Sequence, residues 1–337
     1  MIIRLAESGL LPDILIRGGI RHLLGKRLAG EQSRHQQQDA LLEELSRGPV
    51  AIAQQQANEQ HYEVDARFYE RVLGPRLKYS SALWPEGVND LAGAEQAMLA
   101  LSAERAGLAD GQDILELGCG WGSLTLWMGE RYPGSRVTAI SNSSTQRAWI
   151  MEQARVRGLN NVQVITADAA TFDPQARYDR VVSVEMFEHM RNHRELTSRI
   201  AGWLKPDGKL FVHIFCHRQL TYLFETEGAS NWMGRYFFTG GVMPSFDWLP
   251  RCATDLALEQ SWAVNGSHYG RTLEAWLANA DARRGELVAL LDEGYGKGQG
   301  ALWLQRWRMF FMACAELFNY GGGDEWFVAH YVFQRKR

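Results

Sequence analysis

The chain has 337 residues, 46% of them hydrophobic, so it can bury a substantial core. Its formal net charge of -3 provides no overall positive field, which argues against nucleic acid as a partner. Its four cysteines lack metal-binding or redox spacing, and no apolar run approaches the roughly 20 residues that span a bilayer. We therefore expect a globular, cytoplasmic protein without a metal site, with a homodimer as one possible assembly.

The pattern of apolar residues divides the chain into four parts. Residues 1–60 carry apolar residues at helical spacing and are predicted to form a helical N-terminal extension. In 61–216, strands alternate with helices, which is typical of a Rossmann-like α/β core with a doubly wound, mostly parallel sheet. Residues 217–324 are rich in aromatic and helix-forming residues, contain no clear parallel strand, and are predicted to form a helical lid with the acceptor pocket. The last part, 325–337, is predicted to be a strand that pairs beside KLFVHIF.

A glycine-rich turn follows the first predicted strand of the core, in the stretch ILELGCGWGSL. Glu116 precedes Gly118 and Gly120, and a helix follows, so the backbone can turn tightly and approach a ligand. A dinucleotide site would need GxGxxG and an acidic residue at the end of the second strand, where Ser141 and Asn142 stand instead. The pattern favours S-adenosylmethionine, which has no diphosphate and whose ammonium group suits an acid at the head of the turn.

The third predicted strand, in VQVITADA, ends at Asp168. Its side chain can accept a hydrogen bond from an adenine amino group. The alternative role is a helix N-cap, and one carboxylate can fill both roles.

The fourth predicted strand, YDRVVSVE, delivers Glu185, Glu188 and His189 to the carboxyl edge of the sheet. Methylation of an amine requires a free lone pair, and deprotonating an amine of pKa about 10 at pH 7 costs roughly 4 kcal/mol. A histidine and carboxylates are suited to take this proton, so these three residues are the candidate catalytic group. The alternative is a first helical turn whose acids complement the helix dipole.

Several long stretches resemble one family. The chain is similar to the cyclopropane-fatty-acid-synthase superfamily of S-adenosylmethionine-dependent methyltransferases, and within it to the coclaurine and pavine N-methyltransferases. The matching stretches run from about residue 60 to the C-terminus: HYEVDARFY, LGPRLKYSSALWP, ILELGCGWGSLTL, SNSSTQ, MFEHM, WLKPDGKLFVHIFCH, RYFFTGGVMPS, VNGSHYGRTLEAW and AELFNYGGGDEW.

The resemblance implies roles for individual residues. The methionyl end of the cofactor would contact Tyr79 and Ser80 above Gly118 and Gly120, the ribose Ser141, Asn142 and Gln146, and the adenine Asp168 and Ala169. The EMFEH run would supply the acids and the histidine that handle an amine. The implied reaction is N-methylation of a hydrophobic, aromatic amine of the tetrahydroisoquinoline type.

The cyclopropane-forming branch provides the main alternative. Those enzymes hold a bicarbonate base at positions that correspond to Glu188, His213 and Tyr269, with a backbone contact at the position of Ser81. They usually have glycine where this chain has Glu185, and an extra carboxylate suits a cationic amine better than an alkene. The alternative activity is C-methylation or cyclopropanation of unsaturated acyl chains on phospholipid, with the basic N-terminal helix at the membrane. A catalytically idle cofactor-binding protein is a further alternative, which the intact glycine turn and EMFEH argue against.

Aromatic residues of the predicted lid are candidate walls of the acceptor pocket. Aromatic faces stabilise a methylated cation by roughly 0.5 to 2 kcal/mol each, although core packing is the alternative use of such residues. The candidates are Phe237, Phe238, Trp303, Trp307, Phe310, Phe311 and Trp326, with His213, His268 and Tyr269 as supporting groups.

Overall fold

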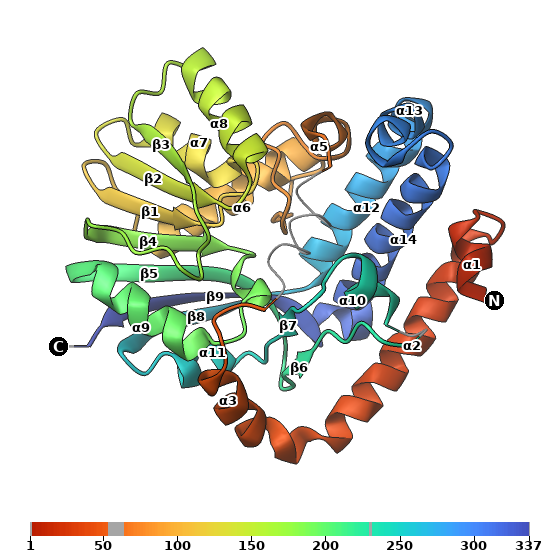
Figure 1. The fold of residues 1–337 in the computed structure, drawn as a ribbon, viewed down its shortest axis with the longest axis horizontal. Coiled ribbons are helices and arrows are strands. Elements are labelled where there is room, and N and C mark those ends of the chain that lie inside the picture. The colour runs from red at the N-terminus through yellow and green to blue at the C-terminus, as the bar shows by residue number, and fades with distance from the viewer. Residues whose placement is uncertain (1, 53–63, 229–230, 337) are drawn as a thin grey trace.

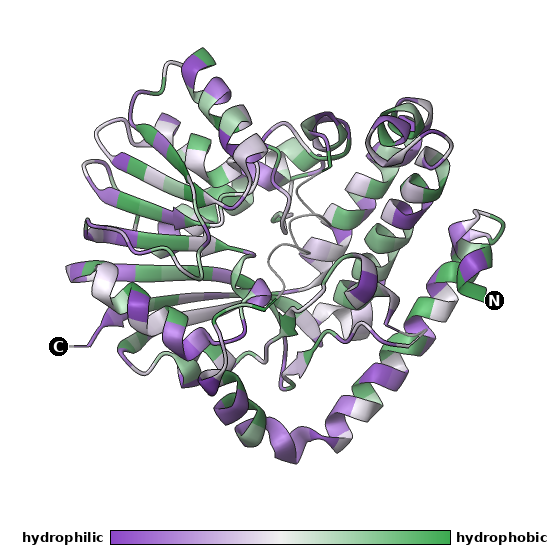
Figure 2. Ribbon diagram, in the orientation of Figure 1, coloured by the Kyte–Doolittle hydropathy of each residue, from purple (hydrophilic) through white to green (hydrophobic). Residues whose placement is uncertain are grey.

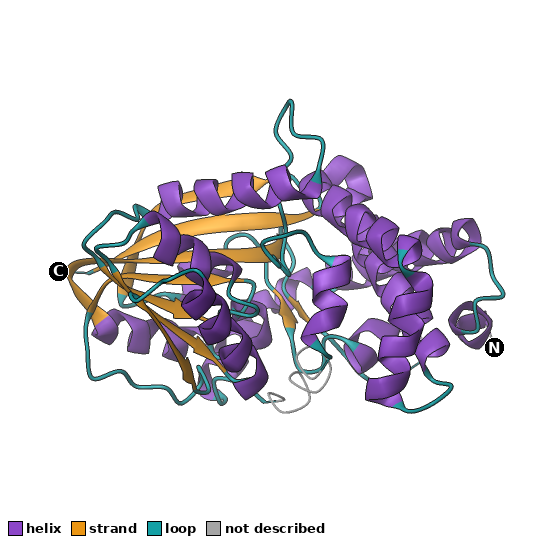
Figure 3. Ribbon diagram, turned by 90° about the horizontal axis from the view of Figure 1, so that it is seen from above, coloured by secondary structure: helices purple, strands orange, loops and turns teal. Residues whose placement is uncertain are grey.

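A computed structural model of the protein describes residues 2–52, 64–228 and 231–336. Its main sheet has seven strands in the order β3-β2-β1-β4-β5-β9-β8, with helices on both faces (Figures 1 and 3). Strands β1 to β5 pair in parallel, whereas β9 runs antiparallel between β5 and β8. The predicted doubly wound, mostly parallel sheet is confirmed.

The strands of this sheet are β1 (Asp113–Leu117), β2 (Arg136–Ser141), β3 (Val162–Thr166), β4 (Tyr178–Val184), β5 (Leu204–His217), β8 (Leu256–Val264) and β9 (Trp326–Arg335), and a separate small ribbon pairs β6 (Tyr222–Leu223) with β7 (Val242–Met243). The α-helices are α1 (Ile2–Glu7), α2 (Asp13–Ser33), α3 (Gln38–Arg47), α5 (Ala66–Val72), α6 (Leu91–Ala106), α7 (Ser123–Arg131), α8 (Ser144–Val156), α9 (His193–Trp203), α10 (Trp232–Tyr236), α11 (Trp248–Cys252), α12 (Ser267–Ala282), α13 (Arg284–Tyr295) and α14 (Gly300–Asn319). Short 3-10 turns are η1 (His35–Gln37), η2 (Phe187–His189) and η3 (Tyr320–Gly323).

Local sequence signals set the ends of the helices in the core. The side chain of Asp90 accepts a hydrogen bond from the Gly93 N–H at the start of α6, and Gly107 ends this helix in a left-handed conformation at φ +62°. The side chains of Ser143 and Asn192 likewise accept a backbone hydrogen bond at the start of α8 and of α9. Each cap satisfies a backbone donor that the first helical turn leaves unpaired.

The C-terminal strand confirms one prediction and corrects another. β9 pairs with β5 along its whole length, as expected for a strand that returns beside KLFVHIF. The segment 217–324, however, does contain a strand of the main sheet. β8 is antiparallel to β9 and therefore parallel to β5. Its stretch LALEQSWAV lies at the sheet edge, where much of it is partly or fully exposed, so it lacks the continuous apolar run of a buried parallel strand.

The first two N-terminal helices lie against the lid, whereas α3 packs on α9 beside the sheet. α1 and α2 pack on α14, on the side of the molecule opposite β1 to β3 (Figure 1). Arg17 forms ion pairs with Glu274 and Glu316 of the lid, at 2.6 and 3.1 Å, and Arg21 pairs with Glu316 at 2.8 Å. These basic residues therefore hold α2 against the lid. The predicted boundary near residue 60 lies outside the described residues.

Hydropathy follows this arrangement. The strands of the main sheet are largely hydrophobic, whereas α2, α3 and α9 alternate hydrophobic with hydrophilic residues (Figure 2). The same figure shows hydrophobic segments on the helices of the lid. Among the described residues, no helix combines the length and the apolar character required to cross a membrane.

Candidate functional site

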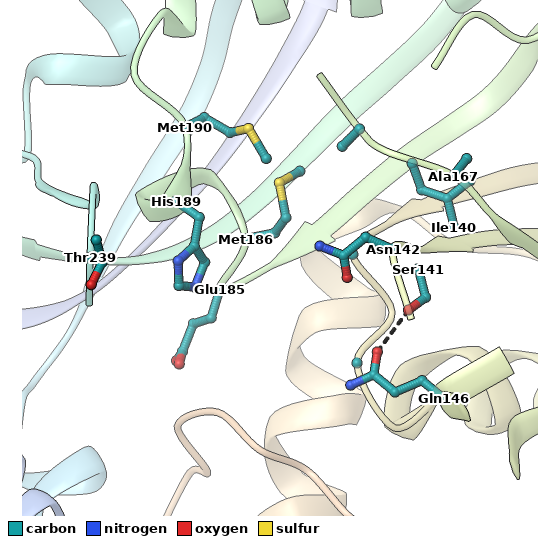
Figure 4. Close-up of a pocket in the computed structure, with 13 residues that line it drawn as sticks. Ile140, Ser141, Asn142, Gln146, Ala167, Glu185, Met186, His189, Met190 and Thr239 are labelled. Atoms are coloured by element: carbon teal, nitrogen blue, oxygen red, sulfur yellow. Dashed lines mark hydrogen bonds between the residues drawn. The ribbon is translucent and has the colours of Figure 1, made fainter. Parts of the chain in front are cut away.

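Loops at the carboxyl ends of β1 to β4 form a cleft with two adjoining pockets. The first pocket is lined by residues at or after the carboxyl ends of these four strands: Gly118, Gly120, Ile140, Ser141, Asn142, Gln146, Ala167, Ala169, Glu185, Met186, His189 and Met190, together with Thr239. Figure 4 shows Glu185 and His189 on one side of this pocket and Ser141 and Gln146 on the other. The second pocket includes Lys78, Tyr79, Ser80, Glu116 and Trp121. Both contain Gly118, Gly120 and Glu185, so we treat them together as the polar cleft, with Glu185 at the junction.

The two glycines at the start of the turn serve different purposes. Gly118 has φ +75°, and a Cβ there would lie 2.5 Å from Cγ of Met186. Gly120 has φ +52°, and a Cβ there would meet no atom of the described residues within 4 Å. Gly118 is therefore required for packing, whereas Gly120 leaves open space in which a ligand can approach the backbone.

A buried donor faces the part of the cleft assigned to the ribose. Ser141 donates a hydrogen bond to Oε1 of Gln146 at 2.7 Å, which fixes the orientation of the amide. The Nε2 group of Gln146 is buried and has no partner among the described residues. Because buried donors are normally paired, this amide is suited to a ligand acceptor such as a ribose hydroxyl. Asn142 lines the same pocket.

Asp168 stabilises a turn and does not fill the alternative predicted role of a helix N-cap, because in the described residues β3 is followed by β4 with no helix between them. Its carboxylate accepts a hydrogen bond from the N–H of Ala170 at 2.7 Å and so stabilises the turn after β3. Its neighbours Ala167 and Ala169 line the first pocket, whereas Asp168 itself is not among the lining residues. A contact between Asp168 and adenine stays a prediction.

The second pocket contains a buried acid and a buried base. Glu116 is 2% exposed and accepts a hydrogen bond from the hydroxyl of Thr125 at 2.5 Å. Burial raises the pKa of Glu116 to about 8. Burial also lowers the pKa of Lys78 to about 8, and this amine donates to Oγ of Ser80 and to the carbonyl of Ser81. Lys78 was not among the predicted site residues, although the stretch LKYSSALW presents it as the one charge in an otherwise uncharged run.

Glu185 is held by an unusual backbone conformation and by three donors. Its φ is +47°, which is costly for a residue with a side chain, and its N–H donates to the carbonyl of His213 at 2.8 Å. One carboxylate oxygen accepts from the N–H of Ser81 at 2.9 Å and contacts Nε2 of His213 at 3.1 Å. The other accepts from the hydroxyl of Tyr269 at 2.6 Å.

The electrostatics around Glu185 decide the nature of these contacts. Burial raises the pKa of Glu185, while the charge of Lys78 and the hydrogen bonds from Ser81 and Tyr269 oppose this rise. Burial, with Lys78 and Arg105 nearby, holds the pKa of His213 well below 6.5. His213 is therefore neutral, and its contact with Glu185 is a hydrogen bond rather than an ion pair.

The next turn separates the other two predicted catalytic residues. Glu188 is 1% exposed, its Oε2 has no partner among the described residues, and burial followed by repulsion from Glu185 raises its pKa well above 4.5. His189 lines the polar cleft, and its ring stacks on Phe238 with 5.5 Å between ring centroids. The structure therefore brings Glu185 and His189 together at the cleft, whereas Glu188 is not among the residues that line it.

A large apolar cavity of about 530 Å³ adjoins the part of the polar cleft that contains Glu185 and His189. Its walls come from α1, α2, α14 and the β6 to β7 region, and they include Phe215, Phe310 and Cys314. Tyr269 and Phe238 also line it. The hydroxyl of Tyr269 binds Glu185 and the ring of Phe238 packs on His189, so the cavity adjoins Glu185 and His189 through these two side chains.

Only some of the predicted aromatic walls line this cavity. Phe238, Phe310 and Tyr269 do, whereas Phe237, Phe311, Trp303, Trp307 and Trp326 are not among its lining residues. Trp303 stacks on Tyr295 at 3.9 Å, and the indole of Trp326 donates to the hydroxyl of Tyr222.

Other residues that were predicted to form or support the walls of the acceptor pocket also have packing roles. Phe237 stacks on Phe310 with 4.3 Å between centroids, and Trp307 is fully buried against Phe68. The ring of His268 accepts a hydrogen bond from the Trp84 N–H at 3.0 Å. Sequence periodicity alone did not distinguish these two uses of an aromatic side chain.

The polar cleft fits S-adenosylmethionine on three observations. Within residues 2–52, 64–228 and 231–336, Gly120 leaves open space beside the backbone and the amide of Gln146 offers an unpaired buried donor, and Glu116 places a carboxyl group near the start of the turn. Together with the strand order, they define the fold and the site of a class I methyltransferase.

The comparisons with known proteins agree with this class. The family described as mycolic acid cyclopropane synthetase matches residues 51–326, and the chain belongs to this family. The chain is 36% identical to (S)-coclaurine N-methyltransferase of Thalictrum flavum subsp. glaucum, over 99% of this chain and 95% of the relative. It is 32% identical to pavine N-methyltransferase of the same plant, over 99% and 96% of the two chains.

The structure is similar to the crystal structure of a coclaurine N-methyltransferase bound to N-methylheliamine and SAH. The TM-score is 0.95 and the sequence identity is 33%, with 99% of each chain covered. The chain is therefore an S-adenosylmethionine-dependent methyltransferase.

Proposed function

We propose that this methyltransferase acts on the nitrogen of a hydrophobic, aromatic amine of the tetrahydroisoquinoline type. The observation that carries the proposal is the position of the Glu185 carboxylate, at the junction of the polar cleft and beside the apolar cavity through Tyr269. A flat, apolar amine fits the cavity, and its nitrogen would meet a carboxylate at the cavity's polar end. The names of the relatives, which are N-methyltransferases, support the same substrate class.

The reaction places a simple demand on the protein. Bound S-adenosylmethionine supplies an activated methyl group, and the chain must present a neutral nitrogen in line with it. The Glu185 carboxylate attracts the ammonium form of the amine and fixes its position. Because burial raises the pKa of Glu185, this carboxylate is a stronger base than an exposed glutamate, and with His189 it accepts the proton that frees the lone pair.

Glu188 has a supporting role in this proposal. A buried carboxyl oxygen without a partner is costly, and the cost is smallest while the group stays protonated. When a cationic amine reaches Glu185, its charge would favour the ionised form of Glu188 as well. We therefore assign Glu188 an indirect role, as a second acid that does not line the cleft but responds to the charge of an amine bound at Glu185.

Cyclopropanation or C-methylation of unsaturated acyl chains is the second candidate, because the family description and the large apolar cavity are compatible with a lipid chain. That reaction would use bicarbonate held by Glu188, His213, Tyr269 and the backbone of Ser81. In this structure three of these groups, His213, Tyr269 and the Ser81 backbone, bind the carboxylate of Glu185. Glu185 thus fills the position that the bicarbonate would need, which favours the amine.

The test compares methyl transfer to two acceptors. Purified protein is incubated with labelled S-adenosylmethionine and either a panel of tetrahydroisoquinolines or vesicles of phospholipid with unsaturated acyl chains. We expect label in the amines, lost in Glu185→Gln, and none in the lipid. Label in lipid alone, unaffected by Glu185→Gln, would refute the proposal. Glu185→Gly with added bicarbonate shows whether vacating the carboxylate position opens the second activity.

A further inference from the structure

A line of four side chains crosses the sheet from Glu185 to helix α6. His213 on β5 and His330 on β9 are direct partners in the antiparallel register, and both are fully buried. Nε2 of His213 contacts Glu185 at 3.1 Å, and Nδ1 of His213 contacts Nε2 of His330 at 2.9 Å. Nδ1 of His330 contacts the Arg105 guanidinium at 2.9 Å. Arg105 lies on α6, which packs against β5 and β9.

The arginine sets the direction of every hydrogen bond in this line. A guanidinium has only donors, so Nδ1 of His330 must accept, and the ring proton of His330 must be on Nε2. This proton points at Nδ1 of His213, which must therefore accept in turn. The proton of His213 is then on Nε2 and points at Glu185. All three hydrogen bonds thus run from Arg105 toward the carboxylate.

The same logic forbids an extra proton on either ring. A doubly protonated His330 would direct an N–H at the Arg105 donor. A doubly protonated His213 would direct an N–H at Nε2 of His330, which already carries its proton. The two histidines therefore cannot take a proton from Glu185, and the line does not conduct protons away from the cleft.

We propose that Arg105 and His330 are positioning residues that lock His213 as a neutral donor and thereby keep Glu185 in its ionised form. This inference rests on the proposed role of Glu185 as the group that receives the amine. A proton that Glu185 takes from the amine must then leave through the cleft, on the side of His189. The burial of both rings and the low pKa values of His213 and His330 agree with this assignment.

Loss of Arg105 should change the titration of the cluster in one direction. Without the Arg105 donor, Nδ1 of His330 can hold a proton. The two remaining hydrogen bonds can then reverse direction, and Glu185 with the two histidines can take up one proton at a higher pH. The ionisable groups around Glu185 and the two rings are Lys78, Glu188, His189, Tyr269 and Cys314, besides Arg105. None of them supplies a donor to Nδ1 of His330 in the described part of the chain.

The experiment reads the tautomers directly by ¹⁵N NMR of histidine-labelled protein between about pH 6 and pH 9. We expect both rings in the Nε2–H form over this range in the unmodified protein. In Arg105→Met we expect His330 to lose its single tautomer, and the acid limb of the kcat/KM profile for the amine to move up by about half a pH unit or more. Arg105→Lys keeps a group that only donates, and it should restore the Nε2–H tautomer of His330 and the original pH profile of kcat/KM.

Matched variants separate positioning from packing, because Arg105 also stacks on Trp262 with 4.7 Å to the ring centroid. Arg180→Met removes another half-buried guanidinium, which donates to the Ala106 and Gly107 carbonyls at the end of the same helix. It should leave the tautomers and the pH profile unchanged.

An Nδ1–H form in the unmodified protein, or identical tautomers and profiles in Arg105→Met, would overturn the inference. If Arg105→Met does not fold, the tautomers of Arg105→Lys and of the unmodified protein still decide the question. Locked tautomers in a protein that methylates no amine would refute the proposed function while this inference stands.

Discussion

The polar cleft and the apolar cavity adjoin at Glu185 but are built in opposite ways. The cleft takes backbone groups and short polar side chains from loops that directly follow β1 to β4. The cavity takes apolar side chains from both ends of the chain, α1 and α2 on one side and α14 on the other. The comparison teaches that donor binding is encoded locally, whereas the apolar cavity, the proposed acceptor site, exists only once distant helices have packed. Substitutions in the two regions should therefore act on different substrates.

The largest expected effect is on the donor side. Gly120→Val places a side chain in the open space beside the turn and should weaken S-adenosylmethionine binding by about 100-fold or more, equivalent to about 2.7 kcal/mol. Gly158→Val is the control, because Gly158 also has positive φ and open surroundings but is remote from the cleft. It carries the same backbone strain and should bind normally. Micromolar binding by Gly120→Val in calorimetry would contradict this placement of the site.

The groups at the junction should affect chemistry rather than donor binding. We expect Glu188→Ala and His189→Ala each to reduce amine turnover by about tenfold or more, because each loses a group that handles the proton or the charge of the amine. Affinity for S-adenosylmethionine, measured by calorimetry, should stay within about twofold. Glu104→Ala, at an exposed acid on α6, is the control. Normal turnover in both Glu188→Ala and His189→Ala would show that these residues only stabilise the turn after β4.

A change in the cavity should affect the acceptor alone. Ala313 lies on α14 in the cavity wall, and Ala313→Trp should raise the KM for a bicyclic amine by about tenfold by filling the space. The KM for a small amine should change less, and donor affinity should not change. Ala278→Trp, at an exposed position of α12, provides the control. A parallel loss of donor affinity in Ala313→Trp would show that the two regions are not separable.

The smallest effect concerns the proton on Glu116. Its pKa of about 8 means that the carboxyl group is mostly protonated at pH 7 before the donor binds. The ammonium of the donor favours the ionised form and lowers this pKa, so binding should release up to about one proton. Calorimetry in two buffers of different ionisation enthalpy measures this release, which Glu116→Gln should abolish. An equal release in both proteins would place the ammonium elsewhere.

The same group gives a stability prediction of defined sign. Its pKa is raised above the ordinary 4.5 in the folded state, so the folded protein holds a proton that the unfolded chain gives up. The contribution of Glu116 to stability is therefore fully present below about pH 4.5 and is lost as the pH rises toward about 8. Denaturant unfolding of the ligand-free protein should show this dependence reduced in Glu116→Gln.

The sequence predicted the sheet and the glycine turn because both depend on local patterns. Apolar runs of strand length separated by amphipathic helices specify the parallel core, and the glycine spacing with Glu116 specifies the kind of ligand. β8 escaped prediction because an exposed edge strand lacks the apolar run of a buried one. Trp303 and Trp326 were expected at the acceptor pocket and do not line the apolar cavity, since the composition of an aromatic segment does not say which ring faces a cavity.

By itself, the sequence determined the class of fold, the donor and the three ionisable residues after β4, since each follows from residues close together in the chain. Only the tertiary structure decided that Glu185 is held by Ser81, His213 and Tyr269, that Glu188 lies apart from the cleft, and that α1 and α2 line the apolar cavity. The physical reason is that burial, pKa and hydrogen-bond direction depend on what packs around a group. Those neighbours come from distant parts of the chain.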